Sequence, residues 1–157
     1  MSTLFVDNIS NLAGTSAMTI DSNGKVSMPQ RPFMLATHDV ATTYSSSDVI
    51  TNFAVEDNNE ITESNGVFTV STAGLYYINL NLLSTVLGSG IYLQKNSTTQ
   101  WRFLYFDGGG NYEHASATAV LNLNASDTIR FTVQSSTYIY GATTTGTVGS
   151  FTMFFLG

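Results

Sequence analysis

Histidine is the residue of this chain best suited to acid–base chemistry, and the chain has two copies of it. His38 precedes Asp39, and His114 follows Glu113. Nucleophilic catalysis needs an activated serine or cysteine beside such a base. The chain has no cysteine and no nucleophile-elbow sequence. We therefore predict that both histidines are polar loop or strand-end residues and that the protein is not an enzyme.

The acidic run EDNNEITE is a second group that could do chemistry, through Glu56, Asp57, Glu60 and Glu63. Carboxylate oxygens are ligands that Ca²⁺ prefers, and pairs of carboxylates cleave glycosides. The spacing of the run matches no defined calcium loop, and short loops do not build the long cleft that a glycosidase needs. We interpret the run as a solvated turn and predict no cofactor, with Ca²⁺ binding and glycoside hydrolysis as the alternatives.

Aromatic side chains gather in the segment 101–112, beside a run of three glycines at 108–110. Tryptophan and tyrosine are over-represented at binding hot spots because they bury a large area with few rotatable bonds. Ordinary outer-sheet core is the alternative, and we assign Phe103 and Leu104 to it. The residues predicted to contact a receptor are Trp101, Tyr105, Asp107 and Tyr112.

The elements that must position these residues come from a composition with few charges. Only 10% of the 157 residues are charged, and the net charge is −6. Nucleic-acid binders carry a basic footprint, so we exclude nucleic acid as a partner. No apolar run reaches the ~18 residues that span a bilayer, which argues against membrane insertion. The start, MSTLFVDNISN, lacks the basic and apolar regions of a secretory signal, so we expect synthesis in a cytoplasm.

From residue 33 onward, apolar and polar residues alternate with a period of two. In GLYYINLNLL, Tyr76, Ile78 and Leu80 share one face, while Asn79 and Asn81 lie on the other. DTIRFTV alternates in the same way. Several such segments separated by turn residues are typical of a β-sandwich or barrel. The sequence therefore predicts an all-β domain without helices.

Two segments are apolar on both faces. SFTMFFLG has Phe151 and Met153 on one face, and Phe154 and Leu156 on the other. QWRFLYF is also apolar on both faces. A sandwich strand normally faces solvent on one side, so such a segment needs a second cover. We predict that another subunit provides it, with internal loops as the alternative.

The first 31 residues differ from the rest and form a separate segment. MTIDSNGKVSM predicts a β-hairpin that turns at Asn23 and Gly24. Pro29 and Pro32 mark the boundary, because proline resists helix and central-strand positions. The segment is too short for a core of its own. We therefore expect residues 1–31 to attach to a partner and residues 32–157 to form the main domain.

The stretch GVFTVSTAGLYYINLNL resembles the signature of the C1q-like domain of the complement and tumour-necrosis-factor superfamily. IYLQKNSTT resembles its hairpin with a Lys-Asn turn, and GSFTMFFLG resembles its closing strand. The resemblance covers residues 32–157 and implies a ten-stranded jelly-roll sandwich that forms a homotrimer. It places QWRFLYF on the outer sheet, so it does not explain the two apolar faces of that segment. The trimer interface that it implies contains Phe33, Leu35, Tyr77, Phe154 and Leu156.

The segment NLAGTSAMTIDSNGKVSMPQRPFML resembles linkers that precede receptor-binding tips in tail-fibre and head-fibre proteins of tailed bacteriophages. The two resemblances imply a non-enzymatic phage protein on the virion surface. Residues 1–31 would bind other virion proteins, and the trimeric head would bind a glycan or protein of the host surface. The alternatives are a capsid decoration protein without a receptor role and a ligand-binding module of the complement-head type. A trimer could also gather three copies of a histidine on its axis, where they could bind zinc.

Overall fold

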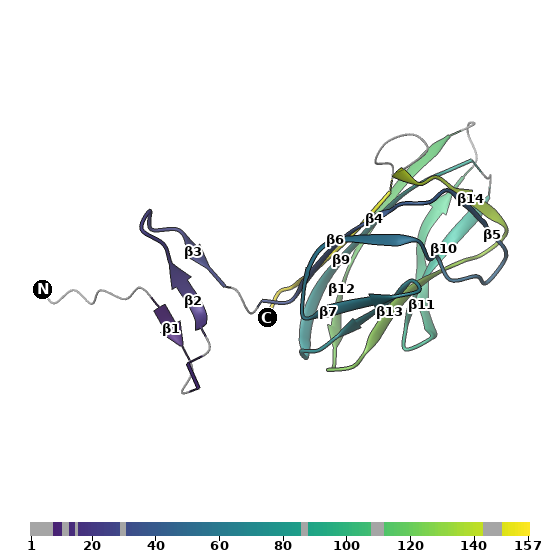
Figure 1. The fold of residues 1–157 in the computed structure, drawn as a ribbon. Helices are drawn as coiled ribbons and strands as arrows, with labels where there is room; N and C mark the ends of the chain where they lie inside the picture. Colours follow the sequence, from purple (N-terminus) through teal and green to yellow (C-terminus); the bar gives the residue numbers. More distant parts are fainter. Residues whose placement is uncertain are drawn as a thin grey trace, which may run out of the picture. The chain divides into compact units, whose positions relative to one another are not determined.

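The computed structural model of residues 1–157 divides into two compact units, Met1–Arg31 and Pro32–Gly157 (Figure 1). Each sheet formed by the described residues lies within one unit. No described helix is long and apolar enough to cross a membrane. The residues that the structure describes are 8–10, 13–14, 16–28, 31–85, 88–107, 112–142 and 149–157.

The N-terminal unit contains a small antiparallel sheet. Its strands are β1 (Asn8–Ser10), β2 (Ser16–Ile20) and β3 (Val26–Ser27), and β2 lies in the middle. The pairing of β2 with β3 confirms the predicted hairpin.

The turn of this hairpin depends on one aspartate and one glycine. The Oδ1 atom of Asp21 accepts hydrogen bonds from the backbone N of Asn23 and of Lys25, at 2.8 and 2.9 Å. Gly24 provides a φ of 78°, which glycine adopts without strain. Described apolar side chains at this end of the unit are not buried in a core, since Val26 and Met28 are each 49% exposed.

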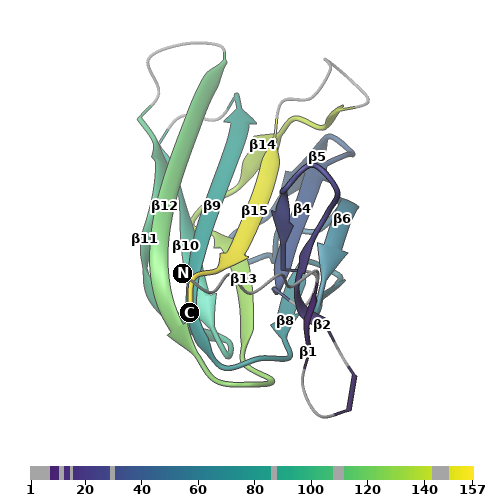
Figure 2. The same cartoon turned by 90° about the vertical axis from the view of Figure 1, so that its left-hand side faces the viewer.

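The C-terminal unit is a sandwich of two antiparallel sheets (Figures 1 and 2). The five-stranded sheet has the order β11 (Thr98–Phe106), β10 (Ser89–Lys95), β13 (Thr128–Val133), β8 (Val67–Val70), β7 (Ile61–Ser64). The seven-stranded sheet has the order β5 (Thr42–Tyr44), β14 (Thr137–Ile139), β9 (Gly74–Ser84), β15 (Ser150–Phe155), β4 (Phe33–His38), β6 (Phe53–Asn59), with β12 (Glu113–Leu123) on the other edge of β9.

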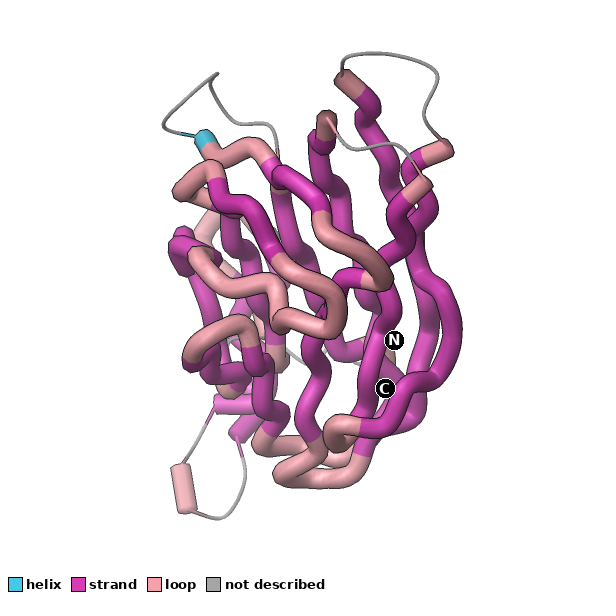
Figure 3. The backbone as a smooth tube through the Cα atoms, turned by 90° about the vertical axis from the view of Figure 1, so that its right-hand side faces the viewer, coloured by secondary structure: helices cyan, strands magenta, loops and turns pink. Residues whose placement is uncertain are grey.

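Strands far apart in the sequence pair with each other, β4 with β15 and β8 with β13. This is the arrangement of a jelly roll, so the predicted all-β jelly-roll sandwich is confirmed. Seen from the side opposite to Figure 2, strands make up most of the backbone (Figure 3). The described residues of this unit form twelve strands instead of the expected ten, because the three-residue strands β5 and β14 add a short pair beside β9.

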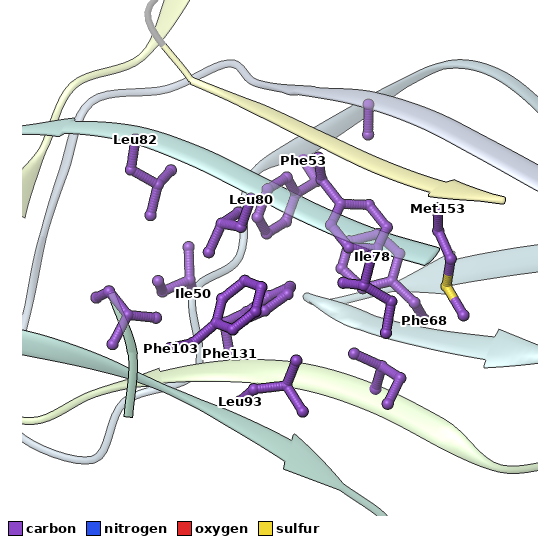
Figure 4. Packing of buried hydrophobic residues seen from close by; sticks show 14 of the residues in the cluster. Ile50, Phe53, Phe68, Ile78, Leu80, Leu82, Leu93, Phe103, Phe131 and Met153 are labelled. Atoms are coloured by element: carbon purple, nitrogen blue, oxygen red, sulfur yellow. The ribbon is translucent and has the colours of Figure 1, made fainter. Parts of the chain in front are cut away.

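The core lies between the two sheets and follows the period-two pattern of the sequence. On β9, Tyr76, Ile78 and Leu80 are fully buried and face the other sheet. β9 is central because β12 pairs with one of its edges and β15 with the other. Inward side chains from both sheets meet in Figure 4, which shows the close packing expected of a protein interior.

A chain of phenylalanine rings links the two sheets across the core. Phe68 of β8 stacks on Phe151 of β15, with 3.9 Å between the ring centroids. Phe53 contacts Phe68 edge-on at 5.2 Å, and Phe131 contacts Phe151 at 5.7 Å. Phe103 stacks on Phe131 at 5.5 Å. Each such pair contributes about 0.5–1.5 kcal/mol beyond the burial of its area, so the rings hold the sheets in register.

Strand β11 departs from the period of two, which corrects the interpretation of QWRFLYF. Against β10, Leu104 pairs with Ile91 and Arg102 pairs with Tyr92, so Phe103 is an extra residue between the two pairs. A β-bulge of this kind turns neighbouring side chains toward one side. Phe103 and Leu104 are accordingly both buried, at 8% and 4% exposure. They belong to the core, as predicted, and the apolar character of this segment does not require cover from a second subunit.

Candidate assembly and binding surfaces

A row of four side chains crosses the outer face of the seven-stranded sheet. Phe154 of β15 pairs with Tyr77 of β9 on one side and with Phe33 of β4 on the other. Tyr77 also pairs with Val120 of β12. These strands lie side by side in Figure 2, and directly paired residues project to the same face. The row is open to solvent, since Phe154 is 41% and Val120 is 54% exposed.

Three leucines widen this row into a patch, here called the apolar band. Leu75 and Leu156 extend it at one end of the sheet, where Leu156 N donates a hydrogen bond to Leu75 O at 2.7 Å. Leu35 extends it on β4, in the outward position next to Phe33. The leucines are 45%, 47% and 36% exposed, respectively. The apolar band consists of Phe33, Leu35, Leu75, Tyr77, Val120, Phe154 and Leu156.

All five residues predicted for a trimer interface lie in the apolar band. The other two, Leu75 and Val120, were not predicted from the sequence. Leu75 shares the parity of Tyr77 on β9, so the alternation of that strand could have identified it. Val120 required knowledge that β12 pairs with β9, which the sequence does not give. Contiguous apolar patches on a protein surface mark interaction sites.

The outward positions of β9, β12 and β15 carry no aspartate, glutamate, lysine or arginine in the described residues. Beyond the apolar band these positions hold Leu83, His114 and small polar side chains. The small polar side chains are Asn79, Asn81, Ser116, Thr118, Asn122, Ser150 and Thr152. Depletion of charged residues distinguishes the core of a protein–protein interface from the remaining surface.

Three tyrosines gather at the far end of the same face. Tyr140 N donates a hydrogen bond to Leu83 O at 2.9 Å, which places the end of β14 beside the end of β9. The ring of Tyr140 lies 5.4 Å from that of Tyr112 and 4.8 Å from that of Tyr138, centroid to centroid. Tyr138 and Tyr140 were not predicted from the sequence as surface residues of interest, although the alternation in TYIY could have indicated that they share a face.

The four residues predicted to contact a receptor lie in different places. Trp101 is 40% exposed and pairs with a buried leucine of β10, so it projects from the core side of the edge strand β11. Tyr105 is 45% exposed and projects from the outer side of the same strand. Asp107 follows β11, and Tyr112 belongs to the group of tyrosines on the other sheet. The structure therefore does not join these four residues into one surface.

His38, the last residue of β4, is fully buried. Its Nδ1 atom lies 2.9 Å from Tyr140 O, and its Nε2 atom lies 3.1 Å from the hydroxyl of Tyr44. Because a carbonyl only accepts, Nδ1 is protonated and donates to Tyr140 O. The hydroxyl of Tyr44, which lies beside Nε2, donates to Thr51 O at 3.1 Å. Burial lowers the pKa of His38. This ring connects strands inside one domain, whereas His114 is exposed on β12.

The carboxylates of the acidic run serve separate hydrogen bonds. Glu56 and Glu60 accept from the hydroxyls of Thr37 and Thr72, each at 2.9 Å. Glu63 accepts from a backbone N of the β7–β8 turn at 2.7 Å. Among the residues that the structure describes, no three His, Cys, Asp or Glu side chains come together as metal ligands. The run therefore stabilises turns and strand edges in these parts of the chain.

An open groove of about 430 Å³ lies at the free edge of the five-stranded sheet. It is lined by Glu60, Thr62, Thr69, Val70, Ser71 and Ser126. Glycosidases generally use two carboxylates on opposite sides of the scissile bond. The lining of this groove offers only the carboxylate of Glu60, so the groove does not provide that pair.

The model of the C1q domain family matches residues 33–156. Among solved structures, murine APRIL is similar with a TM-score of 0.65 and 12% identity, over 80% of this chain and 99% of that chain. The globular domain of zebrafish complement 1qA has a TM-score of 0.61 and 17% identity, over 80% of this chain and 98% of that chain. Eiger TNF from S. frugiperda has a TM-score of 0.61 and 12% identity, over 81% of this chain and 94% of that chain. Comparison with curated proteins gave no match.

Because sequence identity is low in each case, these structural similarities establish the fold alone. C1q and TNF family members form homotrimers and bind receptors or other ligands, and their domains are typically not enzymes. Fold, strand pairing and the extent of the family match agree with one another. The chain therefore belongs to the C1q domain family, and residues 33–156 form its C1q domain.

Proposed function

We propose that this protein is a non-enzymatic, homotrimeric binding head. The observation that carries the proposal is the apolar band, seven side chains on a sheet face without charged neighbours on β9, β12 and β15. Exposing such a patch to water is unfavourable, and burying it against other copies of the chain removes that cost. Three copies around one axis bury equivalent surfaces in a closed ring. The homotrimers formed by family members support this arrangement.

We assign residues 1–31 to attachment. The small N-terminal sheet leaves Ile9, Val26 and Met28 about half exposed, so these side chains are available to a partner. The resemblance of this segment to linkers of bacteriophage fibres supports other virion proteins as the partner class. On this basis we place the protein on the virion surface, as the tip of a tail fibre or as a head fibre.

The C1q domain then presents a ligand-binding surface to the host cell. The apolar band occupies the outer face of one sheet, so assembly leaves the outer face of the five-stranded sheet, on the opposite side of the sandwich, free for a ligand. Of the predicted receptor residues, Tyr105 lies on this free face and Tyr112 on the assembly face. Three identical contacts on one rigid head raise avidity without tight single sites.

Substitution in the apolar band tests the assembly. Phe154→Asp adds a charge to the middle of the band and should leave monomers or insoluble protein, measured as molar mass by light scattering after size exclusion. Val40→Asp is the matched control, because Val40 is 48% exposed but lies outside the band. Its molar mass should equal the wild-type trimer. A monomeric wild type, or trimers of Phe154→Asp, would contradict the proposal.

Gold-labelled antibodies against residues 32–157 test the place and role of the protein. They should label virions from cells that carry the gene, and the same antibodies should block adsorption of the virions to the host. Labelled capsids whose adsorption continues unchanged would indicate a decoration role without receptor binding. Virions without label would refute the assignment to the particle.

A further inference from the structure

Both arginines of the C-terminal unit lie on the outer face of the five-stranded sheet. Arg102 is on β11 and Arg130 is on β13, with β10 between the two strands. On β10, Tyr92 pairs with Arg102, and Gln94 pairs with Arg130. Strand spacing and rise place the Cα atoms of the arginines roughly 12 Å apart. Two long cationic side chains therefore flank the polar and aromatic side chains of β10.

The bulge in β11 gives this face a preformed cation–aromatic pair. Because Phe103 is the extra residue, Arg102 and Tyr105 project to the same side although they are three residues apart. Arg102 Cζ lies 5.0 Å from the centroid of the Tyr105 ring. A cation–π contact orients the guanidinium, and a stacked guanidinium keeps its in-plane N–H groups for hydrogen bonding.

Gly90 makes room for this arrangement. It pairs with Tyr105 across the strands. A Cβ at Gly90 would lie 3.1 Å from Arg102 Cδ and 2.6 Å from Gln134 Oε1. The absence of a side chain at Gly90 therefore lets Arg102 lie along the sheet surface.

Neither arginine has a carboxylate partner among the described residues. The ion pair found there joins Lys95 and Asp127 at 2.7 Å. Arg102 is exposed and contacts the Tyr105 ring, while Arg130 Nε donates to the neutral Gln94 Oε1 at 2.7 Å. In a chain of net charge −6, two such cations on one face leave a local positive charge that complements an anion.

We propose that this face binds a saccharide that carries carboxylate groups. A guanidinium binds a carboxylate through two parallel hydrogen bonds, and the rings of Tyr92 and Tyr105 provide apolar surface for a sugar ring. A dense polyanion such as nucleic acid fits less well, because the domain as a whole is acidic and repels it. This inference rests on the proposed attachment to a host surface and specifies the chemical class of its ligand.

A matched pair of ligands tests the inference with the full-length protein. The probes are trigalacturonic acid and its fully methyl-esterified form, which share the sugar rings and differ in charge. Calorimetry should show that the acid binds at least about tenfold more tightly, the size of effect that one charge-assisted hydrogen bond gives. Arg102→Gln and Arg130→Gln should each remove most of this difference. Thr62→Ala, on the same sheet but on β7, is the control and should bind like wild type.

Equal affinity for the acid and the ester would overturn the inference, as would wild-type binding by both arginine variants. Circular dichroism identifies a variant that has not folded. If one arginine variant does not fold, the other variant still tests the inference. Amide chemical shifts of the wild type provide a second test, because residues on β10, β11 and β13 should shift when the acid is added. Shifts confined to other strands count against it. Molar masses of the same samples distinguish the two proposals. Trimers that do not bind the acid would overturn only the saccharide site, and monomers that bind the acid would overturn only the proposed homotrimer.

Discussion

At the scale of single residues, Asp127 holds together the turns at one end of the sandwich. Its carboxylate accepts hydrogen bonds from Asn96 Nδ2 at 2.7 Å, from Lys95 Nζ at 2.7 Å and from Asn124 N at 2.8 Å. These hydrogen bonds, led by the one from Asn96, lower the pKa of Asp127 to about 2. The charged carboxylate is therefore the form that the folded state prefers, and it joins the β10–β11 turn to the β12–β13 turn.

Replacement of this carboxylate should give a pH-dependent loss of stability. The folded pKa of Asp127 lies below that of an unfolded aspartate, so its contribution is complete above about pH 4 and is lost as the pH falls toward about 2. Asp127→Asn should lower the free energy of unfolding at pH 7 by on the order of 2 kcal/mol. In urea titrations, the gap between variant and wild type should shrink between pH 4 and pH 2.

Asp107→Asn is the control for this experiment, because Asp107 is an exposed aspartate that follows a strand. It should leave the free energy of unfolding close to wild type at both pH values. A gap between Asp127→Asn and wild type that stays constant down to pH 2 would show that the carboxylate does not titrate in this way.

At the scale of elements, the turn between β7 and β8 illustrates how tightly the sheet edges are packed. Asn65 and Gly66 both have positive φ, 51° and 77°, as in a two-residue hairpin turn of type I′. A Cβ at Gly66 would lie 2.0 Å from Ile50 O and 3.0 Å from Val49 Cγ1. Backbone close approach, and not only the positive φ, therefore requires glycine here.

Two alanine substitutions separate these effects. Gly66→Ala should lower the free energy of unfolding by at least about 3 kcal/mol. The alanine would be strained by its positive φ, and in addition the backbone at Ile50 would have to move away from the new Cβ. Gly88→Ala should cost only about 1 kcal/mol, since Gly88 has a similar φ of 73° but its Cβ would meet no atom of the described residues closer than 3.7 Å. Chemical denaturation measures both values, and equal losses would show that backbone strain alone accounts for the effect at Gly66.

Sequence patterns predicted the strands whose residues alternate strictly, and missed features that depend on a distant partner. β9 and β15 were predicted with the right residues on each face, because period two alone determines which side chains share a side. The bulge at Phe103 was not predicted, since it is defined by the register with β10. The grouping of Tyr138 and Tyr140 with Tyr112 depends on the pairing of β12 and β14 with β9, and no local pattern encodes that.

At the scale of the whole molecule, the described apolar core belongs to the C-terminal unit alone. Every member of the buried cluster lies between Met34 and Met153, whereas described apolar residues of the N-terminal unit, such as Ile9 and Val26, are half exposed. We therefore expect the stability of the domain not to depend on the first 31 residues.

A shortened chain of residues 32–157 should accordingly fold as the full chain does. Its thermal unfolding midpoint, followed by circular dichroism, should equal that of the major transition of the full chain. Its molar mass by light scattering should show the same oligomeric state, because the apolar band lies entirely in this unit. A shortened chain that is unfolded, or that has a lower molar mass per particle, would assign part of the core or of the assembly surface to residues 1–31.

The chain enters and leaves the C1q domain at neighbouring points. Phe155 N donates a hydrogen bond to Pro32 O at 3.0 Å, and Leu75 N donates one to Gly157 O at 2.7 Å. The two ends of the domain therefore lie close together. A domain with neighbouring ends can be exchanged for another as one unit without disturbing the segments around it.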